Sequence, residues 1–149
     1  MTEEINFYRN KGENGWMSNF FPARIEIDGV KYITIEHYYQ SKKAKTIRYE
    51  AWIANAPTPY LAAVAGRALR ADRDEIDLKW WEENKVDIMR RALRTKFKQH
   101  PDLARLLDMT GDAVLHEDSP TDKFWGKKGK DMLGKLLMEI RDELRRGLL

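Results

Sequence analysis

The chain has 149 residues, of which 42% are hydrophobic and 34% charged, a balance typical of one globular domain with one core. Its 27 lysines and arginines face 24 acidic residues, and the basic residues are spread along the chain, which argues against a protein that binds nucleic acid by charge alone. Because there is no cysteine, disulfides, thiolate metal sites and cysteine nucleophiles are excluded.

The first elements expected along the chain are a β-hairpin and a helix. Ile25 and Ile27 alternate with polar residues, Asp28-Gly29 supplies two residues that tolerate a left-handed turn, and residues 30–33 continue on the far side. Thr34 is a good N-cap, and we expect the helix that follows it to extend through Lys43.

Three helices are expected in the middle of the chain. One carries Trp52 and Ile53 and ends before Pro57, and the next begins at Thr58-Pro59, with apolar residues at helical spacing at positions 61, 65 and 69. The third has an apolar stripe that ends at His100-Pro101, formed by Val86, Met89, Leu93 and Phe97.

The last third of the chain predicts a short helix around residues 103–107, a strand within residues 112–117 and a final amphipathic helix. The final helix has one apolar face, formed by Leu133, Leu136, Leu137, Ile140 and Leu144. Asp131/Lys135 and Asp142/Arg146 are spaced as surface ion pairs on this helix. Together these elements predict an α+β fold, mainly helical, with a small antiparallel β-sheet, in a single domain over residues 1–149.

Metal chemistry and membrane insertion are not expected. The three histidines, at positions 37, 100 and 116, lack the spacing of metal ligands, so we expect neither a metal nor another cofactor. No apolar run approaches the roughly 20 residues that cross a membrane, and the N-terminal Met-Thr-Glu-Glu does not resemble a signal peptide. A cytoplasmic protein is the resulting expectation.

An aromatic loop, residues 15–22, precedes the hairpin and contains Asn19 and Phe20. Considered by itself, such a loop is typically a hydrophobic plug over the end of a sheet. Aromatic faces also stack against flat heterocycles with little demand on sequence, so the same loop is a candidate wall of a binding site.

Three polar residues of the helix after Thr34 share one face. Glu36, Gln40 and Lys43 are separated by four and then three residues, so a carboxylate, an amide and an amine project together. Such a trio is usually an ordinary solvated face. The large aromatics Tyr38 and Tyr39 between them favour burial instead, and buried charges require partners or a function.

A third group, Ser119-Pro120-Thr121-Asp122-Lys123-Phe124-Trp125-Gly126, leads through a lysine-rich run into the last helix. In a functional interpretation, Asp122 hydrogen-bonds a sugar hydroxyl or holds a water. In a structural interpretation, it caps a turn while Trp125 packs in the core. The helix start favours phosphate, and Gly126 with the neighbouring lysines loosely resembles a phosphate loop, but no nucleotide-binding motif is present.

Taken together, these segments resemble the YbiA-like, or NADAR, family over nearly the whole chain. The resemblance rests on residues 16–22 and 34–44, then on Ala65-Gly66-Arg67, Trp81, Lys85, Met89, Lys96-Phe97, residues 107–111, Glu117, Asp122, Trp125-Gly126 and residues 133–141. It implies an N-glycosidase that acts on phosphoribosyl intermediates of riboflavin biosynthesis or on ADP-ribose attached to guanine.

The resemblance also implies site residues. The functional carboxylates and tryptophans would be Glu36, Trp81, Asp122 and Trp125, with Lys43 as the helix lysine, and substrate contacts would involve Asn19, Phe20, Gln40, Arg67 and Gly126. We prefer Trp81 to the adjacent Trp80 because of its spacing to Lys85. The chain departs from the family pattern between residues 125 and 133, where Asp131 replaces an expected Asn, and residues 72–79 look inserted.

The chemistry of cleaving a C1–N bond fits these residue types. Positive charge develops on the ribose ring, so Glu36 and Asp122 suit charge stabilisation and water activation, while aromatic rings hold the base. In a second route, Lys43 attacks C1 as an amine and forms a Schiff base, which requires a lysine made partly neutral by burial. Both routes remain open from the sequence.

Two further function classes are compatible with the sequence. The same aromatic residues and phosphate contacts would serve a non-catalytic ADP-ribose or NAD sensor, and the basic residues would allow a structural or nucleic-acid-binding protein. For an enzyme, the expected partner is a phosphoribosyl or ADP-ribosyl substrate, with ADP-ribosylated nucleic acid as one possible form and no membrane. The sequence leaves the oligomeric state open.

Overall fold

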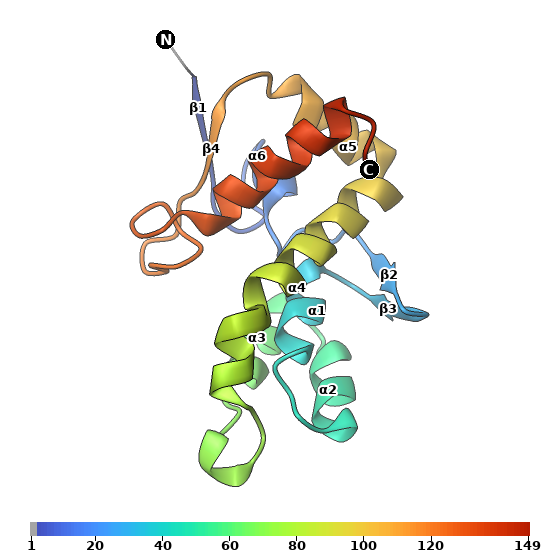
Figure 1. Ribbon diagram of the computed structural model, residues 1–149, viewed down its shortest axis with the longest axis vertical. Coiled ribbons are helices and arrows are strands. Elements are labelled where there is room, and N and C mark those ends of the chain that lie inside the picture. Colours follow the sequence, from blue (N-terminus) through green and yellow to red (C-terminus); the bar gives the residue numbers. More distant parts are fainter. Residues whose placement is uncertain (1–2) are drawn as a thin grey trace. The chain divides into compact units, whose positions relative to one another are not determined.

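The computed structural model describes residues 3–149 and resolves them into two compact units (Figure 1). The inserted unit is formed by residues Pro22–Lys96, and the terminal unit by residues Met1–Phe21 together with Phe97–Leu149. The elements are mainly helical, with two small two-stranded sheets, one antiparallel and one parallel. This confirms the expected α+β class and adds a parallel pair that the sequence did not predict.

The inserted unit begins with the expected hairpin of β2 (Ile25–Ile27) and β3 (Val30–Tyr32). Asp28 and Gly29 form its turn with φ values of 53° and 78°, the left-handed region that Asp and Gly tolerate best. Ile25, Ile27 and Tyr32 are buried, so the alternating pattern points its apolar side into the core.

Helix α1 (Ile35–Ser41) follows the hairpin, and all of its residues are buried. Thr34 caps it as expected, because its hydroxyl accepts a hydrogen bond from the His37 amide at 3.2 Å. The helix ends two residues before the predicted end at Lys43. The amide of Lys43 donates to Gln40 in a tighter turn, after which Ala44 forms a β-bridge with Ile76.

Helices α2 (Ile47–Ala54) and α3 (Pro59–Arg67) pack with α1. Threonine hydroxyls cap both, as the Thr58-Pro59 start predicted for α3. Ile53 belongs to a small core with three alanines, Ala56, Ala62 and Ala65. The predicted apolar stripe of α3 is only partly correct, because Leu61 is exposed and the helix ends before Leu69.

Helix α4 (Leu78–Gln99) contains the predicted apolar stripe and begins at Leu78, well before it. Met89, Leu93 and Phe97 are buried, while Val86 is only partly so. The helix crosses the boundary between the units, since its residues up to 96 belong to the inserted unit and its last residues to the terminal unit. A short 3-10 helix (Ala71–Arg73) precedes it.

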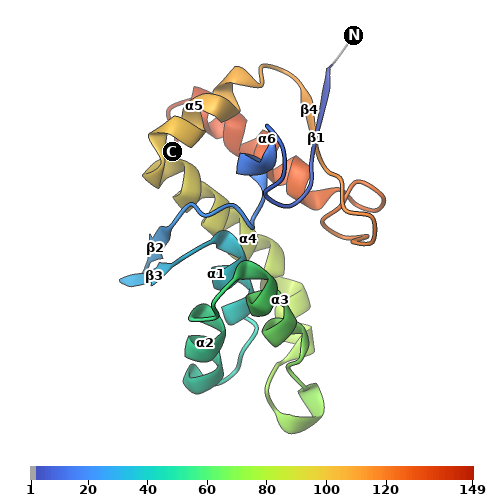
Figure 2. The ribbon, with the colours of Figure 1, turned by 180° about the vertical axis from the view of Figure 1, so that it is seen from behind.

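The terminal unit joins the two ends of the chain through a parallel strand pair. Strand β1 (Glu4–Phe7) pairs with β4 (Val114–Glu117) (Figure 2). The sequence predicted β4 but not β1. Helix α5 (Pro101–Met109) and a 3-10 helix (Gly15–Met17) belong to the same unit.

Helix α6 (Met132–Arg145) packs against β4 through the predicted apolar face. Its buried residues include four of the five expected ones, Leu133, Leu136, Leu137 and Ile140. The predicted pair of Asp142 and Arg146 forms, at 3.1 Å, whereas Asp131 contacts His116. Within residues 3–149, no helix combines the length and the hydropathy needed to cross a membrane.

Candidate active site

Glu36 and Gln40 lie one turn apart on α1 and are bonded to each other. The Gln40 Nε2 atom donates to Glu36 Oε2 at 3.2 Å, and both residues are buried, at 7% and 4% exposure. The expectation that this helix face is buried rather than solvated is therefore correct. A buried carboxylate held by an amide is already oriented, which suits it to stabilise positive charge on a ligand.

Gly66 on α3 provides the space that the Gln40 side chain occupies. A Cβ atom at position 66 would lie 2.0 Å from Gln40 Oε1, so no larger residue fits without moving the amide. Gln40 Oε1 is buried and accepts no hydrogen bond from the described residues 3–149. An unsatisfied buried acceptor is costly, and a hydroxyl or N–H donor of a ligand would remove that cost.

Lys43 reaches the same region from the turn that follows α1. Its Nζ lies 5.6 Å from the centroid of the Tyr39 ring and 5.5 Å from that of Trp81, and the two rings meet edge to face at 4.9 Å. These are cation–π distances, and they hold the amine against two aromatic walls.

The same surroundings change the acidity of Lys43. Burial lowers its pKa to about 8; the charge of Glu36 opposes this shift, while Arg67 and Lys85 add to it. A lysine with this pKa is partly neutral near physiological pH, unlike an exposed lysine. It therefore has the electron pair that a nucleophilic amine requires.

Trp81 is the tryptophan next to Lys43, whereas Trp80 points elsewhere. The exposed fraction is 5% for Trp81 and 46% for Trp80. Of the predicted residues in the inserted unit, Glu36, Gln40, Lys43 and Trp81 come together, and Arg67 at the end of α3 is exposed but close enough to influence the pKa of Lys43.

His37 is buried among these residues but has a structural role. Its Nε2 donates to the carbonyl of Ala56 at 2.9 Å, which leaves Nδ1 to accept from the Thr34 hydroxyl at 2.8 Å. Burial lowers its pKa, so the ring stays neutral and ties α1 to the segment after α2.

In the terminal unit, Asp122 caps a turn. Its Oδ1 accepts hydrogen bonds from the amides of Phe124 at 2.9 Å and Trp125 at 2.8 Å. Trp125 is 9% exposed and meets Phe124 edge to face at 4.8 Å. Asp122 thus caps a turn, which was the structural interpretation of this segment. The cap fixes the carboxyl group of Asp122 beside Trp125.

Six backbone amides between Trp125 and the first turn of α6 are already hydrogen-bonded within the chain. Those of Lys127, Gly129, Lys130, Asp131, Met132 and Leu133 donate to carbonyl groups at 2.7 to 3.2 Å. The loop therefore folds on its own backbone, and the start of α6 offers the phosphate contacts expected from the sequence less readily. The lysine side chains of the loop are exposed and remain available as cations.

Asp131, the departure from the family pattern, is engaged inside this unit. It adopts a left-handed conformation with φ of 53° at the start of α6, a region in which Asn and Asp are both enriched. Its Oδ2 lies 2.5 Å from His116 Nδ1, and His116 Nε2 lies 3.0 Å from Glu4 Oε1. The Asp131 carboxylate therefore contacts the His116 imidazole, whereas the sequence predicted an ion pair with Lys135 on α6.

Glu117 at the end of β4 is an ionisable group that the sequence analysis did not select as a site residue. Its Oε2 accepts from the Ser119 amide at 3.1 Å, and a Cβ atom at Gly126 would lie 3.0 Å from the same oxygen. Burial raises its pKa to about 7, helped by the charges of Asp122 and other nearby carboxylates. Glu117 lies two residues after Leu115 in the same strand, so the two side chains point to the same face, and Leu115 is buried. This alternation was a signal in the sequence for an inward side chain at position 117.

The aromatic loop has one ring that packs as a plug would and another that is partly exposed. Trp16 packs edge to face on Phe97 with ring centroids 6.3 Å apart, as a plug would. Phe20, by contrast, is half-buried, with the Arg9 guanidinium 5.8 Å from its ring, and Asn19 precedes it in the same loop. Asn19 and Phe20 thus belong to the terminal unit with Asp122, Trp125 and Gly126.

These groups define a class of α+β protein with buried carboxyl groups, an amine of lowered pKa and tryptophan walls, which can perform charge-stabilised or covalent chemistry without a thiol. The NADAR domain model matches residues 6–145. The chain belongs to the NADAR domain family.

Its relatives include proteins of similar length. It is 42% identical over 144 residues to N-glycosidase YbiA of Escherichia coli, covering 94% of this chain and 88% of that one. The NMR structure of E. coli YbiA matches with a TM-score of 0.86 at 40% identity, over 99% of this chain and 88% of the other.

Two other relatives extend this range. N-glycosidase Npun_R5314 of Nostoc punctiforme is 41% identical over 152 residues, covering 95% of this chain and 92% of that protein. The riboflavin biosynthesis protein VVA0006 of Vibrio vulnificus is 34% identical over 153 residues, which are 97% of this chain but only 40% of that longer protein.

Proposed function

We propose that the bond cleaved by this N-glycosidase joins C1 of a phosphorylated ribose to the nitrogen of a base or amine. The observation that carries the proposal is the position of Lys43. Its amine, with a pKa of about 8, lies against the Tyr39 and Trp81 rings, and the buried Glu36 influences its charge.

The inserted unit contains the groups that such a cleavage needs. As the C1–N bond lengthens, positive charge develops on the ribose ring, and the Glu36 carboxylate is placed in a buried setting where it stabilises such charge strongly. The faces of Tyr39 and Trp81 favour a flat or cationic group beside them. Gln40 orients Glu36 and offers its own buried acceptor.

In the covalent route, the neutral amine of Lys43 attacks C1. The C1–N bond of the substrate breaks, and the departing nitrogen leaves with a proton. The ring oxygen then releases C1 and takes up a proton as a hydroxyl group, which gives a protonated imine between C1 and Nζ. Water then adds to C1, the lysine leaves as an amine, and the free phosphorylated ribose is released. The net reaction consumes one water, and Glu36 is suited to carry protons in both halves.

In the alternative route, water attacks C1 directly and Lys43 serves only as a positive charge near the phosphate or leaving group. Asp122 and Trp125 enter the proposal through the family resemblance. Within the terminal unit, Asp122 is fixed beside Trp125, and Glu117 with its pKa of about 7 is a carboxyl group able to hold or give up a proton near neutral pH.

Two substrate classes share this bond, the phosphoribosyl intermediates of riboflavin biosynthesis and ADP-ribose attached to guanine in nucleic acid. The name of the Vibrio relative supports the first class. The second candidate function is a sensor that binds ADP-ribose or NAD without turnover, using the same aromatic and polar contacts. No cofactor is needed for either function.

The deciding experiment incubates the purified protein with both substrate classes and measures the released base by chromatography. Release of base supports the N-glycosidase proposal, whereas tight binding without any release would favour the sensor. Borohydride added during turnover should then trap a ribose adduct on the peptide that contains Lys43, if the covalent route operates.

Lysine variants separate the two routes. Lys43→Arg should abolish both trapping and turnover, because a guanidinium keeps its charge and is no nucleophile. The adjacent Lys42, which pairs with Glu50 at 2.8 Å, provides the matched control, and Lys42→Arg should remain active. An active Lys43→Arg enzyme that forms no adduct would eliminate the covalent route and leave direct attack by water.

A further inference from the structure

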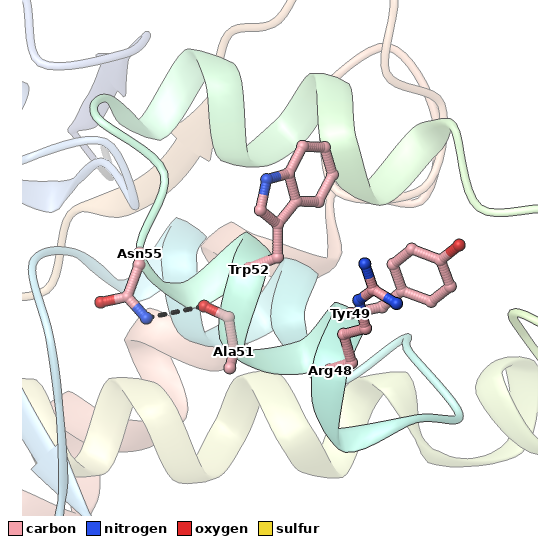
Figure 3. A pocket seen from close by; sticks show the side chains of 5 residues that line it. All are labelled: Arg48, Tyr49, Ala51, Trp52 and Asn55. Carbon is pink, nitrogen blue, oxygen red and sulfur yellow. Dashed lines mark hydrogen bonds between the residues drawn. The ribbon is translucent and has the colours of Figure 1, made fainter.

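The outer face of α2 has an open pocket that none of the groups above uses. Its lining consists of Arg48, Tyr49, Ala51, Trp52 and Asn55. The side chains of Arg48, Tyr49 and Trp52 extend from the same side of the helix (Figure 3). An aromatic pair and a guanidinium thus surround one opening on the inserted unit.

The aromatic residues of this pocket do not serve the core. Trp52 is 64% exposed and Tyr49 36%, whereas the adjacent Ile53 is fully buried and provides the apolar contact of α2. A large aromatic side chain left mostly in water forgoes the free energy of burial, and exposed apolar groups gathered around an opening mark binding surfaces.

The polar groups of the pocket are also available for a ligand. Among the described residues, Arg48 forms no ion pair, although its neighbours Lys42 and Lys45 pair with Glu50 and Asp74. The Asn55 Nδ2 atom donates to the Ala51 carbonyl at 2.7 Å, which leaves the amide oxygen as an acceptor.

The charge of the pocket lining selects the kind of ligand. Arg48 is the one charged side chain that lines the pocket, and among the described residues it forms no ion pair, so an anionic partner is favoured. A stable protein partner would need about 1,000 Å² of buried surface or more, which a pocket formed by a single short helix does not provide by itself. Exposed aromatic faces beside an arginine match the bases and phosphates of an unpaired nucleic acid strand.

We propose that this face of α2 binds single-stranded nucleic acid, with a base stacked on Trp52 and Tyr49 and a phosphate bound by Arg48. Asn55 lines the same pocket, and its oxygen is an acceptor for an N–H group of the base. This inference does not depend on the proposed hydrolysis, because it uses none of the residues assigned to that reaction. It implies that the enzyme has a sequence-tolerant contact to a strand in addition to its substrate site.

The test measures binding of a fluorescently labelled thymidine oligonucleotide by anisotropy at several salt concentrations. Trp52→Ala should weaken binding by about 5- to 100-fold, the effect of losing one base–aromatic stack. Arg48→Ala should weaken binding and make it less salt-dependent by about one phosphate contact. Trp80→Ala is the matched control, since Trp80 is also exposed on the inserted unit but lies outside the pocket.

The outcomes distinguish the proposal from its rivals. Equal binding by wild type and Trp52→Ala, or an equal loss in Trp80→Ala, would overturn it. A preference for duplex over single strand would also contradict base stacking. If Trp52→Ala instead dissociates a dimer in sedimentation, the face is an interface between copies of the chain and the proposal fails. Hydrolysis of a small phosphoribosyl substrate should be unchanged in Trp52→Ala, which separates this result from failure of the proposed function.

Discussion

Lys43 and Glu117 are two residues of the candidate site whose surroundings bring their pKa values close to physiological pH. Burial is the first cause in both cases, lowering the pKa of the lysine to about 8 and raising that of the glutamate to about 7. Groups with such values exchange protons easily at neutral pH, which is the property that acid–base and nucleophilic catalysis require.

The pKa of Lys43 predicts the pH dependence of the reaction. If the amine is the nucleophile, kcat/KM should rise with pH and level off above about 8. The reason is that only the neutral amine attacks, and the protonated fraction of Lys43 falls as the pH passes its pKa. The measurement is a pH profile with a small phosphoribosyl substrate. Lys42→Ala should keep the same profile, and a wild-type rate that does not change between about pH 6 and 9 would contradict a nucleophilic Lys43.

Removing the charge of Glu36 should affect turnover much more than folding. Glu36→Gln keeps the size of the side chain and an oxygen that accepts from Gln40 Nε2, so the melting temperature should change little. The activation barrier should rise by about 2 to 5 kcal/mol, because the charge on the ribose ring loses its stabilising partner. Glu83→Gln, at an exposed position of α4, is the control, and near-wild-type turnover of Glu36→Gln would remove Glu36 from the mechanism.

Glu117 predicts a pH-dependent change in the free energy of unfolding. Its pKa is higher in the folded state than the ordinary value of 4.5, so its contribution is fully present below pH 4.5 and is lost as the pH rises to about 7. Glu117→Gln should therefore stabilise the protein by about 1 to 2 kcal/mol near pH 8, allowing for partial solvent screening, and have little effect near pH 4.5.

Urea unfolding at both pH values measures this effect. The side-chain amide that Glu117→Gln introduces keeps an oxygen that accepts from the Ser119 amide, so the comparison isolates the charge. The exposed Glu13→Gln should give no such gain at either pH. A variant destabilised at pH 8 would show that the Glu117 carboxylate is needed as an ion in the folded protein.

Among the elements, those whose signals are local were predictable from the sequence. The Asp28-Gly29 turn and the Thr34 and Thr58 caps act on residues at most three positions away, and the structure has each of them where it was expected. Elements set by distant contacts were not predictable. Strand β1 exists because it pairs with β4, more than a hundred residues later, and no periodicity in its own sequence reveals that partner.

The candidate site shows the same limit. The spacing of Glu36 and Gln40 correctly placed them on one buried helix face. Lys43 was expected on that face as a further helical turn, yet it reaches Trp81 from beyond the helix end, because the chain turns to form the Ala44 bridge to Ile76. Alternation with Leu115 indicated an inward side chain at Glu117, but the shift of its pKa depends on tertiary packing, which the sequence does not show. The catalytic roles themselves stay predictions.

The contact between α6 and β4 depends on Gly134. A Cβ atom there would lie 2.0 Å from the carbonyl oxygen of Leu115, a backbone atom of the paired strand that cannot rotate away. Gly134→Ala should therefore destabilise the protein by about 1 to 3 kcal/mol, the cost of overpacking, despite the higher helix propensity of alanine. Thermal unfolding measures the loss. Lys135→Ala, the next and exposed helix position, should cause none.

For the whole molecule, the order of the units along the chain is the feature that matters. The terminal unit is formed from two segments, and the inserted unit lies between them in the sequence. The family model matches residues 6–145 and so spans both units. A folded inserted unit limits the separation of residues 21 and 97, which lowers the entropy cost of joining the two segments of the terminal unit. Helix α4 adds to this dependence, because its hydrogen-bonded turns continue across residue 96.

This connectivity predicts that the two units unfold together. With fluorine-labelled tryptophan, NMR in urea would follow Trp16 and Trp125 in the terminal unit separately from Trp52 and Trp81 in the inserted unit. All four signals should change at one urea concentration, the mark of a two-state transition.

Gly134→Ala provides a second test of this coupling, since the substitution perturbs the terminal unit alone. If the units are coupled, the midpoint of Trp52 and Trp81 should fall together with that of Trp16 and Trp125. Midpoints that fall only for Trp16 and Trp125 would show that the inserted unit is stable independently of the segments that flank it.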